Sequence, residues 1–443
     1  MMAELRAFRA LRYNPEKVAW EKVLTQPYDK ITPAMQERYY SLDPHNLISV
    51  EKGKALSTDS EPDSVYTRAA SRLQEWIAAG VLKQDTEPSL YVYSQEFLVP
   101  GTQTRKSRIG LIGLVRLENY EAGVIFRHER TLTGPKADRL ELLRHTRAQT
   151  GQLFLLYSDP EKRIDRLLAD SARGDAACEM RDEYGVLHRL WLISDPQAIG
   201  ELQRAFTSRK LVIADGHHRY ETALAYRDER RAASGQGPSD APHEFAMVTL
   251  VNSAAPGLVI LPTHRVLANL PGFDFAAFRR AMHAHFDWYA YPYSSAEERA
   301  AAAADFRRDL AARGRERRAI GVCSAGVLAL FLLRKDANLA SLLPGISPAQ
   351  RELDVVLLHD VLLLRGLGVT SEAVRAESHV RYEREMDAAI AAVDRGEAQI
   401  AFLLNPVRVE QVMEMALAGE VLPQKSTDFY PKMLSGIANY RME

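Results

Sequence analysis

The order of apolar and polar residues predicts strands and helices in succession along most of the chain. Short apolar runs bounded by turn residues predict strands, and they cover residues 89–99, 109–120, 151–158, 186–193, 211–214, 244–252, 258–267, 319–323, 327–333 and 398–406. Apolar residues at helical spacing predict helices, and they cover residues 64–82, 160–170, 295–314, 353–367, 384–394 and 407–418. This succession indicates an α/β to α+β fold.

A chain of 443 residues is long for one hydrophobic core, so we expect a mixed, multi-domain protein. The turn Leu270-Pro271-Gly272 is the preferred boundary. We predict an N-terminal mixed α/β region over residues 1–120 and a phosphate- or nucleotide-binding catalytic region over 121–270. A C-terminal α/β region over 271–443 is expected to return a polar tail to the site.

The charge balance, the two cysteines and the apolar segments limit the partners and the compartment that we expect for this protein. The chain has 57 basic and 58 acidic residues and a net charge of −1, so its total charge gives no reason to expect nucleic acid or an anionic membrane. Cys178 and Cys323 form neither a disulfide framework nor a zinc pattern, which is typical of a reducing compartment. The start of the chain lacks the apolar stretch of a signal peptide, and His359 and Asp360 interrupt the longest apolar region. We expect a cytoplasmic protein with small-molecule ligands, and leave oligomerisation open.

The segment "ADGHHRYETAL" combines a buried strand, a polar turn and the start of a helix. The first N–H groups of a helix bind anions because they lack internal partners and lie at the positive end of the dipole. Gly216 permits a tight turn, and Arg219 can grip a phosphate with parallel hydrogen bonds. His217 and His218 can donate hydrogen bonds or exchange protons, and Asp215 can orient a histidine or hold Mg²⁺. The set suits phosphate recognition and phosphoryl transfer.

Two other interpretations of this segment remain open. Asp215 can simply be the N-cap of the helix, with both histidines on the surface. A metal site would need a special loop and a distant ligand such as His188, His264 or His128. The sequence contains no GxxxxGK[ST] loop and no dinucleotide fingerprint, so a nucleotide would be bound in another way.

A second polar block, "RHERTLTGPK", precedes a predicted helix. Its charged side chains, threonines and Gly-Pro turn suit an active-site loop. Glu129 or His128 could act as a general base toward an alcohol. Lys136 and Arg130 could neutralise the charge of a transferring phosphate. The alternative is a solvated helix face, which explains well the arginines that follow this block, Arg144 and Arg147.

Two blocks far apart in the sequence are candidates for substrate binding. "QPYD" could contact a substrate through Tyr28 and Asp29, although a proline turn with a packed tyrosine is the simpler account. "LPTHRVL" sets His264 and Arg265 at the end of an apolar strand, where site residues are common and edge histidines equally so.

The C-terminal block "PQKSTDF" is a candidate for phosphate binding. Lys425 offers an ammonium, and Ser426 and Thr427 offer hydroxyls and backbone N–H groups. A plain polar loop is the alternative.

Several blocks together resemble one family. They are "QPYDKI", "RHERTLTGPKADRLELLRHTRA", "ADGHHRYETAL", "LVILPTHRVL" and "PQKSTDFYPKMLSG". In this order they resemble the domain-of-unknown-function family 1015 of bacteria and archaea, from the N-terminus to the last residues. This resemblance implies a family but names no reaction.

The strand, turn and helix around "DGHHR" also resemble the phosphate-binding box of the ParB/sulfiredoxin superfamily, which includes free-serine kinases. Gly216, His218 and Arg219 match the phosphate-gripping positions. His217 stands where sulfiredoxins have a reactive cysteine, which speaks against sulfinic-acid reduction. The chain shows no helix-turn-helix pattern and no basic surplus, which speaks against DNA partitioning.

These resemblances imply a nucleotide-dependent phosphotransferase that uses ATP or ADP with Mg²⁺ and acts on a small hydroxylated metabolite, with free serine as the best guess. His218 and Arg219 would hold the phosphates, and Lys136, Arg130 and Lys425 would stabilise the transition state. One alternative is a phosphatase for phosphoserine or a similar phosphomonoester, with His217 or His218 as nucleophile or acid. The other is a ParB-like regulatory protein that binds CTP or ATP without small-molecule turnover.

Overall fold

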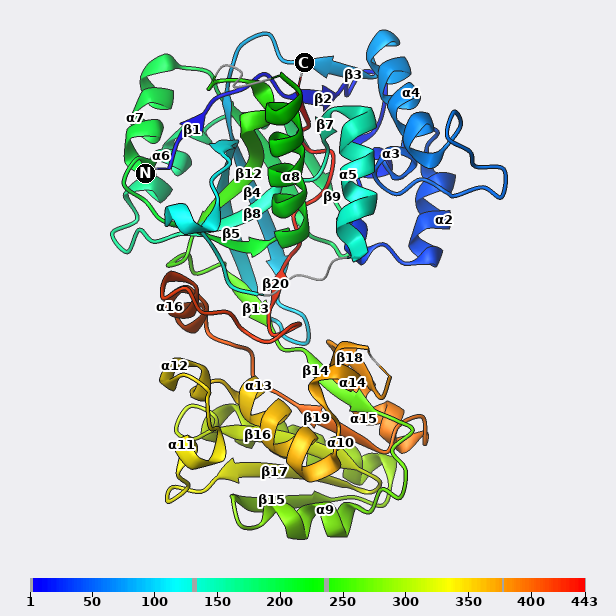
Figure 1. Ribbon diagram of the computed structural model, residues 1–443, viewed down its shortest axis with the longest axis vertical. Helices are drawn as coiled ribbons and strands as arrows, with labels where there is room; N and C mark the ends of the chain where they lie inside the picture. Colours follow the sequence, from blue (N-terminus) through cyan, green and yellow to red (C-terminus); the bar gives the residue numbers. More distant parts are fainter. Residues whose placement is uncertain (1–2, 130–133, 235–238, 377, 443) are drawn as a thin grey trace. The chain divides into compact units, whose positions relative to one another are not determined.

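The chain forms two compact units (Figure 1). In this computed structural model, residues 3–129, 134–234, 239–376 and 378–442 are described. The first unit comprises Met1–Val259, Ala416–Gly419 and Phe429–Glu443, and the second comprises Ile260–Met415 and Glu420–Asp428. Strands from the regions 1–120 and 121–270 pair in one sheet, so the first region and residues 121–259 of the second lie in one compact unit, while residues 260–270 belong to the other.

A large mixed sheet forms the centre of the first unit. Its strands lie in the order β6 (Ile125–Arg127), β11 (Leu211–Asp215), β8 (Leu153–Tyr157), β12 (Phe245–Asn252), β5 (Arg105–Arg116), β4 (Leu90–Leu98), β10 (Leu187–Ile193) and β9 (Cys178–Arg181), and β1 (Leu5–Arg6) pairs with β5. The pairs β6/β11 and β8/β12 are parallel and their neighbours are antiparallel. This arrangement confirms the predicted α/β to α+β class.

The first unit contains helices that the apolar spacing predicted and others that it did not indicate. They are α1 (Trp20–Val23), η1 (Tyr28–Lys30), α2 (Pro33–Leu42), α3 (Ile48–Glu51), α4 (Val65–Ala78), η2 (Tyr120–Ala122), α5 (Gly134–Thr146), α6 (Arg163–Ser171), α7 (Pro196–Phe206), α8 (His217–Ser234) and η3 (Pro242–Glu244). In α4, predicted over 64–82, Ser64 and Thr67 form a capping box, and Leu73 and Trp76 are buried. Gly80 follows the helix with a φ of 67°.

The core of the first unit lies between the sheet and its covering helices. Leu111, Leu155 and Ile213 come from three neighbouring parts of the sheet and are fully buried. Phe206 of α7 and Tyr220 of α8 pack into the same cluster. Burial of these apolar side chains is the main favourable contribution to the free energy of folding. The same packing fixes the end of β11 and the start of α8.

An antiparallel sheet forms the centre of the second unit. Its order is β15 (Phe286–Pro292), β17 (Val327–Leu333), β16 (Ala319–Ser324), β19 (Ile400–Leu403), β14 (His264–Leu267) and β18 (Val380–Glu383). Its helices are α9 (Phe275–Met282), α10 (Ala296–Arg313), α11 (Leu339–Leu342), α12 (Pro348–Arg351), α13 (Asp354–Leu357), α14 (Ser371–Arg375) and α15 (Met386–Asp394). Phe306 and Leu310 of α10 are buried against β16, β17 and β19.

The sequence pattern overlooked some elements of both units. The predicted elements omit strands β9, β15 and β18 and helices α7 and α9, although α7 and α9 each bury two apolar residues four positions apart, as a helix facing the core does. The helix predicted over 353–367 consists of α13 followed by a π-helical segment, η4 (Leu358–Gly366). The helix predicted over 407–418 is α16 (Val409–Leu417).

Short strands tie the C-terminal segment into the first unit. Strand β21 (Tyr440–Arg441) pairs with β7 (Ala148–Gln149), and β2 (Leu11–Tyr13) pairs with β3 (Leu82–Gln84). Isolated bridges join Thr25 to Ser435 and Leu11 to Asn439. The strands β13 (Val259–Leu261) and β20 (Asp428–Tyr430) lie where the chain passes from one unit to the other. In the described part of the chain, every helix is too short or too polar to cross a bilayer.

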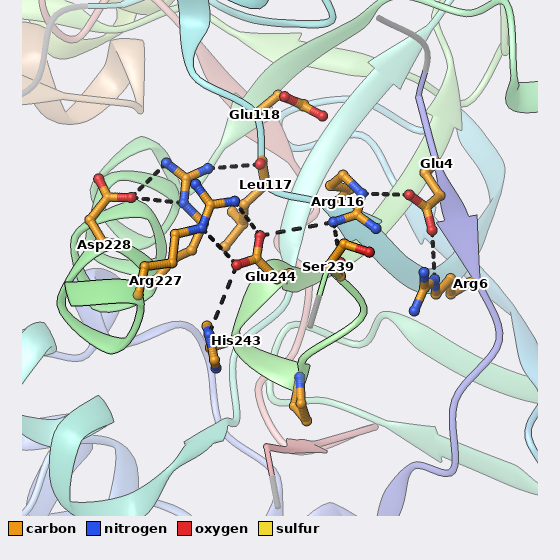
Figure 2. A network of polar contacts seen from close by, with 12 residues as sticks. Glu4, Arg6, Arg116, Leu117, Glu118, Arg227, Asp228, Ser239, His243 and Glu244 are labelled. Carbon is orange, nitrogen blue, oxygen red and sulfur yellow. Dashed lines mark hydrogen bonds and ion pairs between the residues drawn. The ribbon is translucent and has the colours of Figure 1, made fainter. Parts of the chain in front are cut away.

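A buried polar network fixes the C-terminal half of α8 on the sheet (Figure 2). Arg227 donates to the carbonyl oxygen of Leu117 at 2.8 Å. Arg231 donates to both carboxylate oxygens of Glu244, at 2.7 and 2.5 Å. The Glu244 side chain is 4% exposed, and Arg116 of β5 lies 3.9 Å from its carboxylate. The network sets the direction of α8 and therefore the position of its first turn.

We expect Glu244→Ala to lower the free energy of unfolding by about 1 to 2 kcal/mol, because it removes a buried carboxylate that accepts two hydrogen bonds from Arg231, whose side chain is 48% exposed. Chemical denaturation measures this. The control is Glu161→Ala, whose pair with Arg163 is 67% and 71% exposed and should change the stability little. Equal effects of the two substitutions would contradict a positioning role for the network.

Candidate functional site

The turn between β11 and α8 has the geometry of an anion-binding helix start. Gly216 has a φ of 94°, in the left-handed region that favours glycine. Its carbonyl oxygen accepts the N–H of Tyr220 at 2.9 Å, so α8 begins directly after it. The pairing of β11 with β8 shifts register between Ile213 and Asp215. The turn therefore leaves the sheet at the first N–H groups of an 18-residue helix.

Asp215 is surrounded by positive charge. Lys432 Nζ lies 3.1 Å from Asp215 Oδ2, and these side chains are 11% and 22% exposed. Burial alone would raise the pKa of Asp215, but the charges of Lys432, Arg219 and Lys30 outweigh it and hold the pKa well below its usual range. Oδ1 accepts the N–H of Gly216 at 2.8 Å. Both carboxylate oxygens thus have partners, which favours the orienting role of Asp215 over metal binding.

Arg219 lies between two glycines. Its Nη1 donates to the carbonyl oxygen of Gln152 at 2.6 Å. A Cβ on Gly216 would lie 3.2 Å from Arg219 Nε and Nη2, and a Cβ on Gly151 would lie 3.1 Å from Nη1. Any larger residue at either position would crowd the guanidinium. The two glycines therefore leave room for a cation directly beside the start of α8.

A buried arginine holds the C-terminal segment against the sheet. Arg108 is 2% exposed and donates to the carbonyl oxygens of Tyr430 and Pro431, at 3.2 and 2.6 Å. Its burial lowers its pKa to about 10. Gln95 donates to the carbonyl oxygen of Lys432 at 2.8 Å. These contacts fix the backbone from which the Lys432 side chain reaches Asp215.

A cavity of about 60 Å³ adjoins Arg219. Its lining combines polar and apolar groups and comprises Glu51, Arg139, Leu142, Leu143, Ala148, Gln149, Thr150, Gly151, Leu153, Arg219, Thr222 and Ala223. The carboxylate of Glu51 is buried and accepts the hydroxyl of Thr150. Arg139 donates to the carbonyl oxygen of Glu51 at 2.6 Å, and its guanidinium lies 4.4 Å from the centre of the Tyr28 ring. The cavity thus has an anionic and a cationic group in one wall.

Two hydroxyls at this place are buried without a hydrogen-bond partner in the described residues. They are the Oγ1 of Thr222, which lines the cavity, and the Oγ of Ser435. Ser435 Oγ and Glu51 Oε1 lie 3.2 and 3.3 Å from where a Cβ on Gly151 would stand. Buried polar atoms are normally paired, so unsatisfied hydroxyls next to a cavity point to a ligand or water.

The "QPYDK" segment forms part of the same site. Lys52 donates to the carbonyl oxygens of Tyr28 and Ile31, at 3.1 and 2.7 Å, and so holds the short helix η1. Burial raises the pKa of Tyr28 to about 12, although the charges of Arg219 and Arg139 act in the opposite direction. Tyr28 is therefore a neutral hydroxyl near two guanidinium groups. Asp29 is exposed on the same short helix.

Two neutral histidines lie at the turn between β11 and α8. His128 is fully buried, and its Nδ1 lies 2.5 Å from the carbonyl oxygen of Ile213. Its ring lies 4.7 Å from that of His217. Burial lowers the pKa of His128 to about 4 and that of His217 well below its ordinary value. The Nε2 of His217 is buried with no hydrogen-bond partner in the described part of the chain.

The other predicted residues of the first unit lie around this turn. His218 is half-buried on the first turn of α8, and Glu129 is half-buried next to His128. Lys136 of α5 forms an ion pair with Glu221 of α8. Arg130 lies outside the described residues.

The remaining predicted residues belong to the second unit. His264 Nδ1 accepts the N–H of Leu404 at 3.1 Å. Arg265 is buried and donates to the carbonyl oxygen of Lys425 at 3.2 Å. Lys425 is exposed, Ser426 is buried and Thr427 is half-buried. Their binding roles stay predictions.

Sequence reasoning missed part of the site. Lys30, Lys432 and Ser435 stand in the quoted blocks "QPYDKI" and "PQKSTDFYPKMLSG", but neighbouring residues were chosen instead. Glu51 carried no signal, because it is an isolated acid in a polar stretch. Among the described His, Cys, Asp and Glu side chains, no group of three or more is arranged to hold a metal ion.

Comparison with known families identifies the chain. Residues 5–356 match the model of the family described as "Protein of unknown function (DUF1015)". The chain belongs to this family. The resemblance drawn from the sequence blocks is thereby confirmed. A search of curated proteins gave no match.

Solved structures with a similar fold are distant in sequence. A conserved hypothetical protein from Pyrococcus furiosus is 13% identical, covering 71% of this chain and 89% of that one, with a TM-score of 0.31. A free serine kinase in complex with AMP is 12% identical, covering 71% and 86%, with a TM-score of 0.33. SbnI from Staphylococcus aureus, with a C-terminal truncation, is 10% identical, covering 73% and 85%, with a TM-score of 0.33. Similarities this distant do not show what activity this chain has, so a proposal for its function has to rest on its own residues.

The lowered histidine pKa values predict how stability depends on pH. The pKa of His128 lies at about 4 in the folded protein, below the ordinary 6.5, so its contribution is complete above pH 6.5 and is lost as the pH falls toward 4. We expect the wild type to lose about 1.4 kcal/mol per pH unit to this residue within that window. His128→Asn, which can still donate to the Ile213 carbonyl oxygen, should show a shallower loss.

Chemical denaturation at pH 7, 6, 5 and 4.5 checks this. The difference between wild type and variant reports on His128 together with His217, because the charge of His128 also lowers the pKa of His217. Parallel pH curves for the two proteins would contradict a buried neutral imidazole.

Proposed function

We propose that the first unit binds the phosphates of ATP or ADP at the start of α8 and transfers a phosphoryl group to or from a small hydroxylated metabolite, with free serine as the best-supported acceptor. The observation that carries the proposal is the gathering of Arg219, Lys30 and Lys432 around the Asp215 turn. These cations come from three distant segments of the chain, and a capped helix start by itself needs none of them.

Positive charge at this turn suits a polyphosphate. The N–H groups of the first turn of α8 and the guanidinium of Arg219 offer directed hydrogen bonds, and Lys432 offers a point charge. Asp215 holds Lys432 in place and offsets its charge in the free protein. His128 and His217 are neutral near pH 7, so they neither compete with a bound anion nor strengthen its binding by charge.

The cavity beside Arg219 supports a small amino acid as the acceptor. The buried carboxylate of Glu51 suits an ammonium group, and Arg139 suits a carboxylate. The unpartnered hydroxyls of Thr222 and Ser435 suit the polar groups of the same ligand. The place of these groups next to Arg219 would set a bound hydroxyl beside a bound phosphate.

Glu129 is the stronger candidate for the general base. His128 is fully buried and has a pKa of about 4, so it is a weak base and is poorly placed to reach a substrate. Glu129 is half-buried beside it. In the proposed reaction Glu129 takes the proton of the acceptor hydroxyl, whose oxygen bonds to the terminal phosphorus of the nucleotide. The bond from that phosphorus to its bridging oxygen breaks, and the nucleotide leaves with one phosphate fewer. Arg219, Lys432 and Lys136 stabilise the charge that develops on the phosphoryl oxygens. The predicted role of Lys425 stays open.

Mg²⁺ remains a prediction. Bound with a nucleotide, it would supply positive charge that offsets the charge of the phosphates. Both oxygens of Asp215 already have partners, so this carboxylate would have to release Lys432 to become a ligand.

Replacing Arg219 tests whether this residue binds the nucleotide. We expect Arg219→Ala to weaken ADP binding about tenfold or more, because it removes charge-assisted hydrogen bonds. Lys432→Ala should weaken it less. Isothermal titration calorimetry measures binding, and an assay of ATP-dependent serine phosphorylation measures turnover. Lys83→Ala removes a charge that is 59% exposed and should change neither.

Unchanged binding and turnover in the double variant Arg219→Ala with His218→Ala would overturn the proposal. Tight nucleotide binding without any phosphorylated product would favour a regulatory protein instead.

A phosphatase is the second candidate, and the unpartnered Nε2 of His217 favours it. The His217 imidazole is half-buried and neutral, so it keeps the lone pair that a nucleophile needs, but its Nε2 is buried and the turn would have to open for a substrate to reach that atom. Incubation with labelled phosphoserine would trap a phosphohistidine in the wild type and none in His217→Asn.

The glycine of the turn offers a test with a matched control. Gly216→Ala should abolish ADP binding, because the added Cβ lies 3.2 Å from the Arg219 guanidinium and strains a φ of 94°. Gly123→Ala should leave binding intact, because Gly123 has a φ of 68° and nothing within 4 Å of the added atom. Both should lose about 1 kcal/mol of stability. Thermal unfolding and ADP titration of both variants check this, and retained binding in Gly216→Ala would contradict it.

A further inference from the structure

Two polar segments that the site at α8 does not use meet within the second unit. They are "LPTHRVL", which contains β14, and the "PQKST" part of the C-terminal block. Arg265 is 1% exposed and donates to the carbonyl oxygens of both Thr263 and Lys425. The buried guanidinium thereby fixes the backbones of both segments side by side.

A cavity of about 390 Å³ lies where these segments meet. Thr263 comes from one segment and Ser426 from the other, and all of its lining residues belong to the second unit. The polar side chains of the lining are Thr263, Arg315, Arg318, Glu352, Asp354, Asn405, Arg408, Gln411 and Ser426. The cavity is large enough for a small metabolite.

Positive charge exceeds negative charge in this lining. Arg315, Arg318 and Arg408 stand against Glu352 and Asp354. Burial raises the pKa of Asp354 to about 7, even though Arg318 and Arg408 lower it, so this carboxyl is only partly ionised near neutral pH. Arg318 forms an ion pair with Glu352. The remaining guanidinium groups leave the cavity with an excess of positive charge.

One buried donor in the cavity lacks an acceptor. The Nε of Arg318 is buried and has no hydrogen-bond partner in the described part of the chain. Leaving a charged donor unpaired is costly, so an oxyanion supplied by a ligand would relieve this cost. Asn405 is fixed in the same wall, where its Nδ2 donates to the carbonyl oxygen of Leu310 at 3.1 Å. Gly314 makes this possible, because a Cβ there would lie 2.2 Å from that Nδ2.

We propose that this cavity is a second ligand site, which binds a small phosphorylated metabolite through its phosphate group. Arg315, Arg318 and Arg408 form the phosphate-binding wall, because guanidinium groups match the fork geometry and the double charge of a phosphate. Thr263, Asn405 and Ser426 line the part of the cavity that takes the rest of the molecule. This site is built from the second unit alone and does not depend on the function proposed for the first.

Inorganic phosphate is the probe for this site. The full chain carrying Arg219→Ala, which weakens the site at α8, is titrated with phosphate by calorimetry. We expect one phosphate per chain to bind. Adding Arg318→Gln or Arg408→Gln should each weaken that binding about tenfold, the loss expected for one charge-assisted hydrogen bond. The Arg408 side chain is exposed and forms no hydrogen bond or ion pair within the described residues, so its replacement should leave the fold intact.

The matched control is Arg395→Gln, an arginine of the same unit that pairs with Glu397 outside the cavity and should change nothing. Phosphate affinity that is unaffected by both cavity variants would overturn the proposal, as would binding abolished by Arg219→Ala alone. A succinate titration serves as the second arm. Succinate that binds more tightly than phosphate and loses affinity in Arg408→Gln would overturn the phosphate class in favour of a dicarboxylate.

Discussion

The ion pair between Asp215 and Lys432 is the contact on which the candidate site of the first unit depends. It joins the end of β11 to a segment that lies 217 residues later in the chain. Arg108 and Gln95 fix the backbone of that segment from below, through carbonyl oxygens rather than side chains. Because Asp215 also accepts the N–H of Gly216, one carboxylate sets both the turn and the position of the neighbouring cation. Its low pKa keeps this arrangement ionised across the physiological range.

Burial removes the charge of the histidines of the site but not that of its arginine. The histidines behind the turn lose their charge when they are buried, and His128 and His217 are therefore neutral supports. Arginine keeps its charge when it is buried, because its ordinary pKa is so high. Arg219 accordingly provides fixed positive charge in the space that Gly151 and Gly216 leave open. The proposed anion binding would therefore depend little on pH near neutrality.

The polar blocks of the sequence are shared between the two units. "QPYDK", "DGHHR" and "YPKMLSG" build the site at α8, while "LPTHRVL" and "PQKST" belong to the second unit. The C-terminal block is thus divided, and the unit boundary follows Asp428. Each unit uses arginines next to a cavity with incompletely satisfied polar groups. The two proposals together describe a protein that handles more than one anionic ligand.

The sequence by itself determined the local elements and the chemistry of the turn. Apolar spacing predicted β11, α8, α4 and α10, because the helical and strand periods are local properties of the chain, and the DUF1015 family followed from ordered blocks. The prediction omitted β18, which is short and depends on neighbours for its burial, and α9, although its buried Phe278 and Met282 lie at helical spacing. Only the tertiary structure decided that Lys432 and Lys30, rather than their neighbours in the same blocks, face Asp215. It alone placed the buried Glu51 at the cavity, because contacts between distant segments leave no trace in the spacing of residues along one of them.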